Sequence, residues 1–174
     1  MCYTFDMKKH TLVFMLIFTF VVSFSLTSKL YAGSFFDTDP PNQIFLQVDC
    51  PYMTYNEVTQ EIDPGRGTKP VIFPEQKRCY VPLSPLIQIM QGTCSWDSKY
   101  KAIAITVQKV SIKIRINSPK AYVKNQWNWI DRENRQVAPV ILNDRTMVPL
   151  RFIAESLGCC VEWDPEHQII AIKY

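Results

Sequence analysis

Two short segments of the chain carry apolar residues at the spacing of one helical face. In residues 83–90 and 150–157 these residues fall at positions i, i+3, i+4 and i+7, and they are Leu83, Leu86, Ile87 and Met90 in the first segment and Leu150, Ile153, Ala154 and Leu157 in the second. This periodicity predicts two amphipathic helices of about two turns each.

Proline and glycine mark the expected ends of both helices. Pro82 and Pro149 precede the apolar residues and suit a first helical turn, where the backbone N–H has no intrahelical acceptor. Gly92 and Gly158 follow the last apolar positions. Each glycine is therefore expected to end its helix in a left-handed conformation.

Alternating apolar residues predict strands after each helix. Residues 94–96 and 161–163 alternate with period two, and residues 102–107 and 110–116 form a predicted hairpin closed by residues 108–109. The hairpin register places three apolar pairs on one face: Val107 with Val110, Ile105 with Ile112, and Ile103 with Ile114.

Turn-forming residues define a second hairpin and a loop. Residues 140–142 and 145–147 are predicted to pair, because the Asn-Asp dipeptide between them tolerates positive φ. Residues 63–69 hold one proline and two glycines and are predicted to form a loop.

The chain also repeats itself at an offset of about 67 residues. Val81-Pro82-Leu83 recurs as Val148-Pro149-Leu150, and Trp96-Asp97 recurs as Trp163-Asp164. Such a repeat predicts the same local structure built twice, in half-repeats of residues 44–107 and 108–174.

The second half carries a specific resemblance to a known family. Residues 138–158, which include Val148-Pro149-Leu150-Arg151-Phe152, together with Val161-Glu162-Trp163-Asp164, resemble the copper amine oxidase N-terminal domain family, whose members are also called stalk domains. The first half resembles a degenerate copy, so the resemblance covers roughly residues 44–174. It implies an α+β fold, with an antiparallel sheet wrapped around short helices, that lies outside the cell and has neither catalytic residues nor a cofactor of its own.

The sequence departs from the family pattern in three places. Asp144 replaces the usual glycine of the hairpin turn, residues 132–137 look like an insertion, and the first half has Ser84 and Gln88 at the positions of Arg151 and Glu155. The copper site of an amine oxidase needs several histidine ligands. Only His167 lies outside the N-terminal segment, so no such metal site is expected.

The N-terminus reads as a targeting segment. Lys8, Lys9 and His10 precede an uncharged, largely apolar run at residues 11–28, which is typical of a secretory signal. The predicted organisation is a signal peptide at residues 1–32, a linker at 33–43 and the domain at 44–174. An uncleaved membrane anchor is the alternative. In both cases the domain is expected to be extracellular or in the cell envelope.

Composition and charge narrow the classes of function. The chain has 19 basic and 16 acidic residues, and residues 33–174 have a net charge of +1. This balance gives no reason to expect nucleic-acid binding. The domain holds an odd number of cysteines and no CxxC motif, so disulfide pairing stays open among Cys50, Cys79, Cys94, Cys159 and Cys160.

Two pairs of residues are candidate partner-binding residues. Arg151 and Glu155 are four apart on the exposed side of the second predicted helix. They either anchor a partner or form an ion pair within the helix, and the ion pair is the favoured interpretation. Trp127 and Trp129 share one face of a strand. They either form an aromatic platform for a glycan or lie in the core, and the core is favoured.

Other conspicuous residues have simpler interpretations. Trp96 and Trp163 hold equivalent repeat positions and are expected in the core. Asp164, Glu166 and His167 are expected in a turn, because Asp-Pro at 164–165 starts turns.

The resulting hypothesis is a non-catalytic, secreted or cell-surface stalk-type domain. It would associate with an exported protein or a cell-wall component, with self-association left open and membrane contact only through an uncleaved N-terminal segment. One alternative is a glycan-binding module that uses Trp127 and Trp129. The other is a small extracytoplasmic enzyme with a Cys–His pair built on His167.

Overall fold

The computed structural model describes residues 42–174, so the predicted signal and residues 33–41 of the predicted linker lie outside the described residues. The first strand begins at Gln43, which is the last residue of the predicted linker. In chain order the elements are β1 (Gln43–Gln47), β2 (Tyr52–Tyr55), β3 (Val58–Glu61), β4 (Val71–Phe73), β5 (Arg78–Pro82), α2 (Leu83–Ile89), β6 (Thr93–Asp97), β7 (Ala102–Val107), β8 (Val110–Arg115), β9 (Lys120–Val123), β10 (Gln126–Trp129), β11 (Val140–Leu142), β12 (Arg145–Pro149), α3 (Leu150–Ser156), β13 (Cys160–Asp164) and β14 (Ile169–Lys173).

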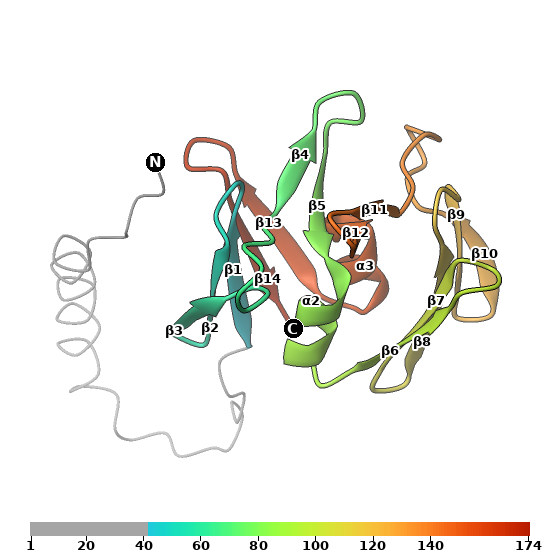
Figure 1. The fold of residues 1–174 in the computed structure, drawn as a ribbon, viewed down its shortest axis with the longest axis horizontal. Helices are drawn as coiled ribbons and strands as arrows, with labels where there is room; N and C mark the ends of the chain where they lie inside the picture. The colour runs from blue at the N-terminus through green and yellow to red at the C-terminus, as the bar shows by residue number, and fades with distance from the viewer. Residues whose placement is uncertain (1–41) are drawn as a thin grey trace, which may run out of the picture. The chain divides into compact units, whose positions relative to one another are not determined.

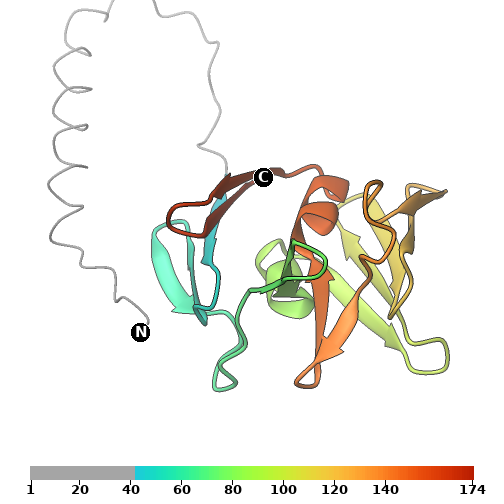
Figure 2. The same cartoon turned by 90° about the horizontal axis from the view of Figure 1, so that it is seen from above.

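Within residues 42–174, three antiparallel sheets pack around two short helices, which confirms the α+β expectation. We call them the terminal sheet, in the order β13-β14-β1-β2-β3, the central sheet, in the order β11-β12-β5-β4, and the meander sheet, in the order β10-β9-β8-β7-β6. The helices and the central sheet lie between the other two sheets (Figure 1 and Figure 2). Among residues 42–174, neither helix is long and apolar enough to cross a membrane.

Both predicted helices are present and bury the predicted faces. Leu83, Leu86 and Ile87 of α2 are buried, as are Leu150 and Ile153 of α3. The prolines differ from expectation, because each is the last residue of a strand and the N-cap of its helix rather than a member of the first turn. Strand and helix therefore follow one another without a loop.

The prediction that a glycine ends each helix in a left-handed conformation is confirmed for α3 and wrong for α2. Gly158 has φ +91°, whereas after α2 the left-handed residue is Gln91, with φ 55°. A glycine is needed at position 92 for a different reason, because there is no room there for a side chain. A Cβ built there would lie 2.5 Å from Val107 Cγ2 and 2.7 Å from the Thr106 carbonyl oxygen. Its backbone therefore approaches β7 more closely than any side chain permits.

Both predicted hairpins are confirmed in register. Val107 faces Val110, Ile105 faces Ile112 and Ile103 faces Ile114, and β8 ends at Arg115, one residue before the predicted boundary. The second hairpin pairs β11 with β12 through a turn in which Asn143 and Asp144 both have positive φ. Residues 63–69 form the predicted loop.

Strands from distant parts of the chain complete two of the sheets. In the terminal sheet β1 pairs with β14, and Ile44 opposite Ile172 is fully buried. In the central sheet β5 pairs with β12, and Val81 lies opposite Val148. Each helix also packs on a strand from the other half of the chain, because α2 packs on β12 and α3 packs on β5.

Two ion pairs fix loops onto the central sheet. Arg145 at the start of β12 donates to both carboxylate oxygens of Asp63, at 2.5 and 3.2 Å. Arg78 at the start of β5 donates to Asp131 at 2.5 Å. All four side chains are at least partly buried, which strengthens such charge-assisted hydrogen bonds relative to exposed pairs.

The Asp63–Arg145 pair predicts a defined pH dependence of stability. The hydrogen bond from Arg145 holds the pKa of the Asp63 carboxyl below its usual value. A pKa that is lower in the folded state adds stability above the unfolded-state pKa, near 3.9, and this stability is lost as pH falls through the folded-state pKa. We expect Asp63→Asn to lower the melting temperature at pH 7, with the difference from wild type shrinking below about pH 4.

Thermal melts from pH 2.5 to 7 test this expectation. Asp49→Asn is the matched control, since Asp49 forms an exposed pair with Lys69 at 3.0 Å and such pairs contribute little. If the difference in melting temperature between Asp63→Asn and wild type stayed constant over the whole pH range, the ionised pair would not stabilise the fold.

Candidate functional site: a groove over helix α3

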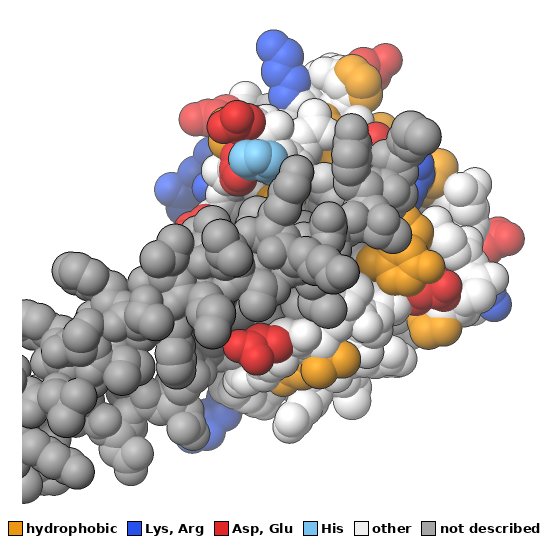
Figure 3. Space-filling view, turned by 90° about the vertical axis from the view of Figure 1, so that its left-hand side faces the viewer, with side chains coloured by type: hydrophobic (Ala, Val, Ile, Leu, Met, Phe, Trp, Pro, Cys, Tyr) orange, Lys and Arg blue, Asp and Glu red, His pale blue; other side chains and the backbone are white. Residues whose placement is uncertain are grey.

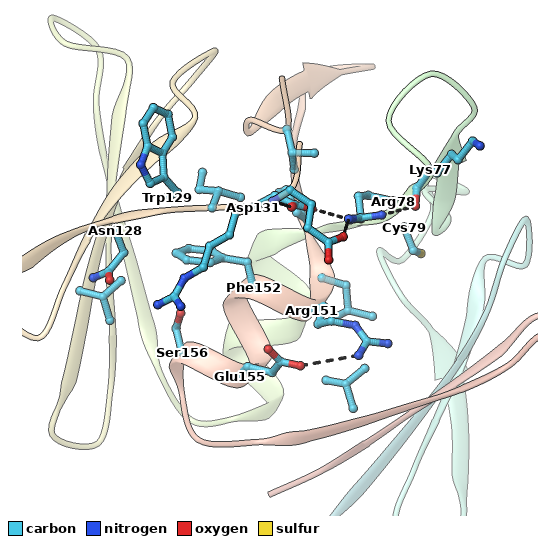
Figure 4. A pocket seen from close by; sticks show the side chains of 18 of the residues that line it. Lys77, Arg78, Cys79, Asn128, Trp129, Asp131, Arg151, Phe152, Glu155 and Ser156 are labelled. Atoms are coloured by element: carbon cyan, nitrogen blue, oxygen red, sulfur yellow. Dashed lines mark hydrogen bonds and ion pairs between the residues drawn. The ribbon is translucent and has the colours of Figure 1, made fainter. Parts of the chain in front are cut away.

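The exposed side of α3 forms the floor of a groove of about 1000 Å³. One wall comes from β9, β10 and the segment that follows β10, and the other comes from the central sheet and β13. Figure 4 shows Asn128 and Trp129 on the first wall and Lys77 and Arg78 on the second. Residues from all three sheets thus meet at one open site.

Three of the four predicted partner-binding residues line this groove. Arg151 and Glu155 project from α3, and Trp129 comes from β10. Arg151 Nη1 lies 3.8 Å from Glu155 Oε1, and their side chains are 60% and 54% exposed. The ion pair favoured by the sequence is therefore present, but it is long and exposed, so it holds the two charges only weakly.

The fourth residue, Trp127, does not line the groove. The prediction that Trp127 and Trp129 lie in the core is wrong. Trp127 is 71% exposed and Trp129 is 38% exposed. Both belong to β10, which is an edge strand of the meander sheet and has a neighbouring strand on one side only. Trp96 and Trp163 were also expected in the core and are 47% and 38% exposed, likewise on the edge strands β6 and β13.

Two cations cover the ring of Trp129. Arg135 Cζ lies 4.0 Å from the ring centroid, and Lys120 Nζ lies 4.7 Å from it. Both distances are within the range of cation–π interactions. The Trp129 ring is therefore already engaged by the protein, whereas Trp127 makes only an edge contact with Tyr122, at 5.4 Å between centroids.

These surroundings predict different effects for the two tryptophans. Trp127→Ala should change the melting temperature little, because an exposed side chain away from the core contributes about 0.5 kcal/mol or less. Trp129→Ala should destabilise by about 1 kcal/mol more, because the two cations lose their partner ring. Calorimetric melts of both single variants test this, and a loss of about 3–5 kcal/mol in Trp127→Ala would restore the core interpretation.

A second set of groove residues was not found from the sequence. Arg78 bonds Asp131 and also reaches Glu133 at 3.3 Å. Burial opposes ionisation of Asp131, but hydrogen bonds from the Asn134 backbone N–H and from Arg78 outweigh it and keep the pKa of that carboxyl below its usual value. The only sequence signal was the repeat offset, which relates Arg78 to Arg145. Phe152 and Trp163 also line the groove, and no pattern in the sequence identified them as site residues.

The geometry does not favour a Cys–His catalytic pair. His167 Nδ1 lies 2.8 Å from Asp164 Oδ2 in the β13–β14 turn, as expected for a turn residue, and Figure 3 shows acidic side chains beside the histidine at the surface. Burial raises the pKa of the Cys79 thiol to about 12 and also raises the pKa of the buried Cys159 thiol. A catalytic cysteine needs the opposite shift. Cys160 lies at the other end of the hairpin from this turn.

The residues present also do not fit a copper centre. Within residues 42–174, no group of three or more histidine, cysteine, aspartate or glutamate side chains is arranged to hold a metal ion. Copper in amine oxidation needs several imidazole ligands, and His167 supplies only one, already engaged with Asp164.

The comparison with protein families confirms the resemblance found in the sequence. Residues 53–172 match the copper amine oxidase N-terminal domain family, and the chain belongs to that family. The domains of this family are non-catalytic and stalk-like. No curated protein and no solved structure gave a significant match.

Proposed function

We propose that the chain is an exported association module whose groove over α3 binds a partner protein. The observation that carries the proposal is the meeting of Arg151, Glu155 and Trp129 in one open groove. The family is non-catalytic, and binding requires only a shaped surface with a few oriented polar groups.

The lining suits an extended polypeptide segment. Half-buried Phe152 and exposed Trp163 supply apolar surface, and aromatic residues are enriched where proteins bind one another. The weakly paired Arg151 supplies a guanidinium group that can bond a partner carboxylate in two places. Arg78 is held by Asp131 and Glu133, so it shapes the rim rather than binding.

A charge-reversal pair tests the groove. The domain would be immobilised and exposed to envelope extract from the producing cell, and retained proteins would be identified by mass spectrometry. Arg151→Glu should abolish retention of the partner. Arg66→Glu, which makes the same charge change in the exposed loop of residues 63–69, should not. Equal retention by both variants would exclude the groove as the binding surface.

Export is part of the proposal and has its own measurement. The basic and then apolar N-terminal segment supports it. The intact mass of the protein recovered from the culture medium or envelope should correspond to a chain that begins at Gly33. A full-length mass in the membrane fraction would favour the anchor, and full-length protein in the cytosol would contradict export.

We also propose that residues 44–107 and 108–174 are two copies of one unit. The elements from β1 to β7 and from β8 to β14 follow in the same order, each with one helix after its fifth strand. Val81 and Val148, which are 67 residues apart, face each other across β5 and β12. The two ion pairs support the same relation, because Asp63 binds Arg145 while Asp131 binds Arg78.

Glycan binding through Trp127 and Trp129 together is the second candidate. The exposure of Trp127 favours it. The cations over Trp129 do not, because the ring is already in contact with Arg135 at 4.0 Å and Lys120 at 4.7 Å.

A further inference from the structure

The outer face of the meander sheet is a separate surface from the groove floor. Successive side chains of a strand alternate between faces, and Ile105 and Ile112 point into the core. Their neighbours point outward. One outward row crosses all five strands of the sheet through paired positions: Trp127, Tyr122, Lys113, Ala104 and Ser95.

This row combines an exposed aromatic edge with free cations and small side chains. Trp127 and Tyr122 form the edge, and Lys113 is exposed on the neighbouring strand, two positions before exposed Arg115. Within residues 42–174, neither Lys113 nor Arg115 forms an ion pair. Asp97, the acidic residue on this face, instead accepts hydrogen bonds from the backbone of its own turn.

The terminal sheet shows that the fold does not require these residues. It has the same number of strands, and a row through paired positions in the corresponding strands reads Thr59, Thr54, Phe45, Ala171 and Glu162. Two threonines replace the aromatic pair there, and their hydroxyls bond each other at 3.1 Å. An equivalent sheet is thus built without the aromatic pair or the lysine, so neither is explained by folding.

We propose that the outer face of the meander sheet binds a carboxylate-bearing polysaccharide. The exposed ring of Trp127 stacks on a sugar ring. A large, flat aromatic face permits this contact because it offers apolar surface to the C–H groups of the sugar. Lys113 and Arg115 pair with the carboxylates. Strands are ~4.8 Å apart, so Lys113 lies only ~10 Å from Trp127. The charge must therefore be carried by the stacked sugar or its neighbour, as in a polymer of uronic acids.

A nucleic acid fits this face less well. It carries a charge on every phosphate, and its binding proteins are strongly basic. Residues 33–174 have a net charge of only +1. Lys120, which is next to Trp129 on this face, already lies over the Trp129 ring.

Affinity electrophoresis with polygalacturonate tests the proposal, with the fully methyl-esterified polymer as the neutral probe of the same backbone. The protein should be retarded by polygalacturonate, less so as salt rises, and not by the ester. Trp127→Ala and Lys113→Gln should each weaken binding at least about fivefold. Arg66→Gln, which removes the same charge in the exposed loop of residues 63–69, should leave it unchanged.

Several results would overturn the proposal. They are absence of retardation by polygalacturonate, equal retardation by the ester, an unchanged affinity of Lys113→Gln, or tighter binding of single-stranded oligothymidylate at equal salt. Because the substituted side chains are exposed, unchanged melting temperatures will show that the variants are folded. The outcome is independent of the groove, since neither Trp127 nor Lys113 lines it.

Discussion

Residues 108–174 expressed alone will give no folded monomer, although they contain the segment that most resembles the family. In the whole domain β14 lies between β13 and β1, and β12 lies between β11 and β5. Removing residues 1–107 deletes β1, β5 and β7 together and exposes Ile172 and Val148, which are fully buried. A unit of about 65 residues is marginal even with an intact core, so it cannot tolerate three unpaired strands.

Circular dichroism and gel filtration at low concentration will check this. We expect an unfolded or associated species, and association would show that a second copy supplies the missing strands. The intact domain should melt in a single transition, because each outer sheet contains strands from both halves. A folded, monomeric second half, or two separate transitions in the intact protein, would establish that the halves are independent.

Substitutions at the end of α2 will have opposite signs at adjacent positions. Gly92→Ala should destabilise the domain by about 1–3 kcal/mol, because the added Cβ meets the backbone oxygen of Thr106 as well as side chains. Gln91→Gly should stabilise it by about 0.5–1 kcal/mol, because Gln91 is the exposed residue that adopts positive φ.

Urea unfolding of the two single variants separates the two roles. The interpretation from the sequence alone, with Gly92 as the left-handed residue, also predicts that Gly92→Ala destabilises. It differs at Gln91, where it predicts that Gln91→Gly destabilises rather than stabilises. If Gly92→Ala were neutral and Gln91→Gly destabilising, the close approach of Gly92 to β7 would not exist in solution.

Local structure was predictable because the signals for it are local. The helical spacing at residues 83–90 and 150–157 and the pairing of residues 102–107 with 110–116 depend on neighbours within one turn or one hairpin. The prediction that Gly92 ends α2 in a left-handed conformation was wrong for a non-local reason. Its sequence position suits a cap, but the contact that excludes a side chain comes from Val107 and Thr106.

Long-range pairing and exposure were not predictable in the same way. Alternation places Trp127 and Trp129 on one face but does not say whether anything covers that face, and at an edge strand nothing need do so. The groove likewise depends on α3 packing against β5 from the other half of the chain. Arg151 and Glu155 were identifiable as a helical pair, whereas Arg78 and Asp131 meet only through the fold.

Site-specific photocrosslinking tests the central claim, that the groove over α3 is the association surface. A benzophenone amino acid would replace Ser156, which lines the groove, and in a control protein it would replace exposed Thr59 in β3. On the surface of the producing cell, Ser156 should give one crosslinked partner that disappears when Arg151→Glu is added, and Thr59 should not give it. Identical products from both positions, or a Ser156 product that survives Arg151→Glu, would contradict the account.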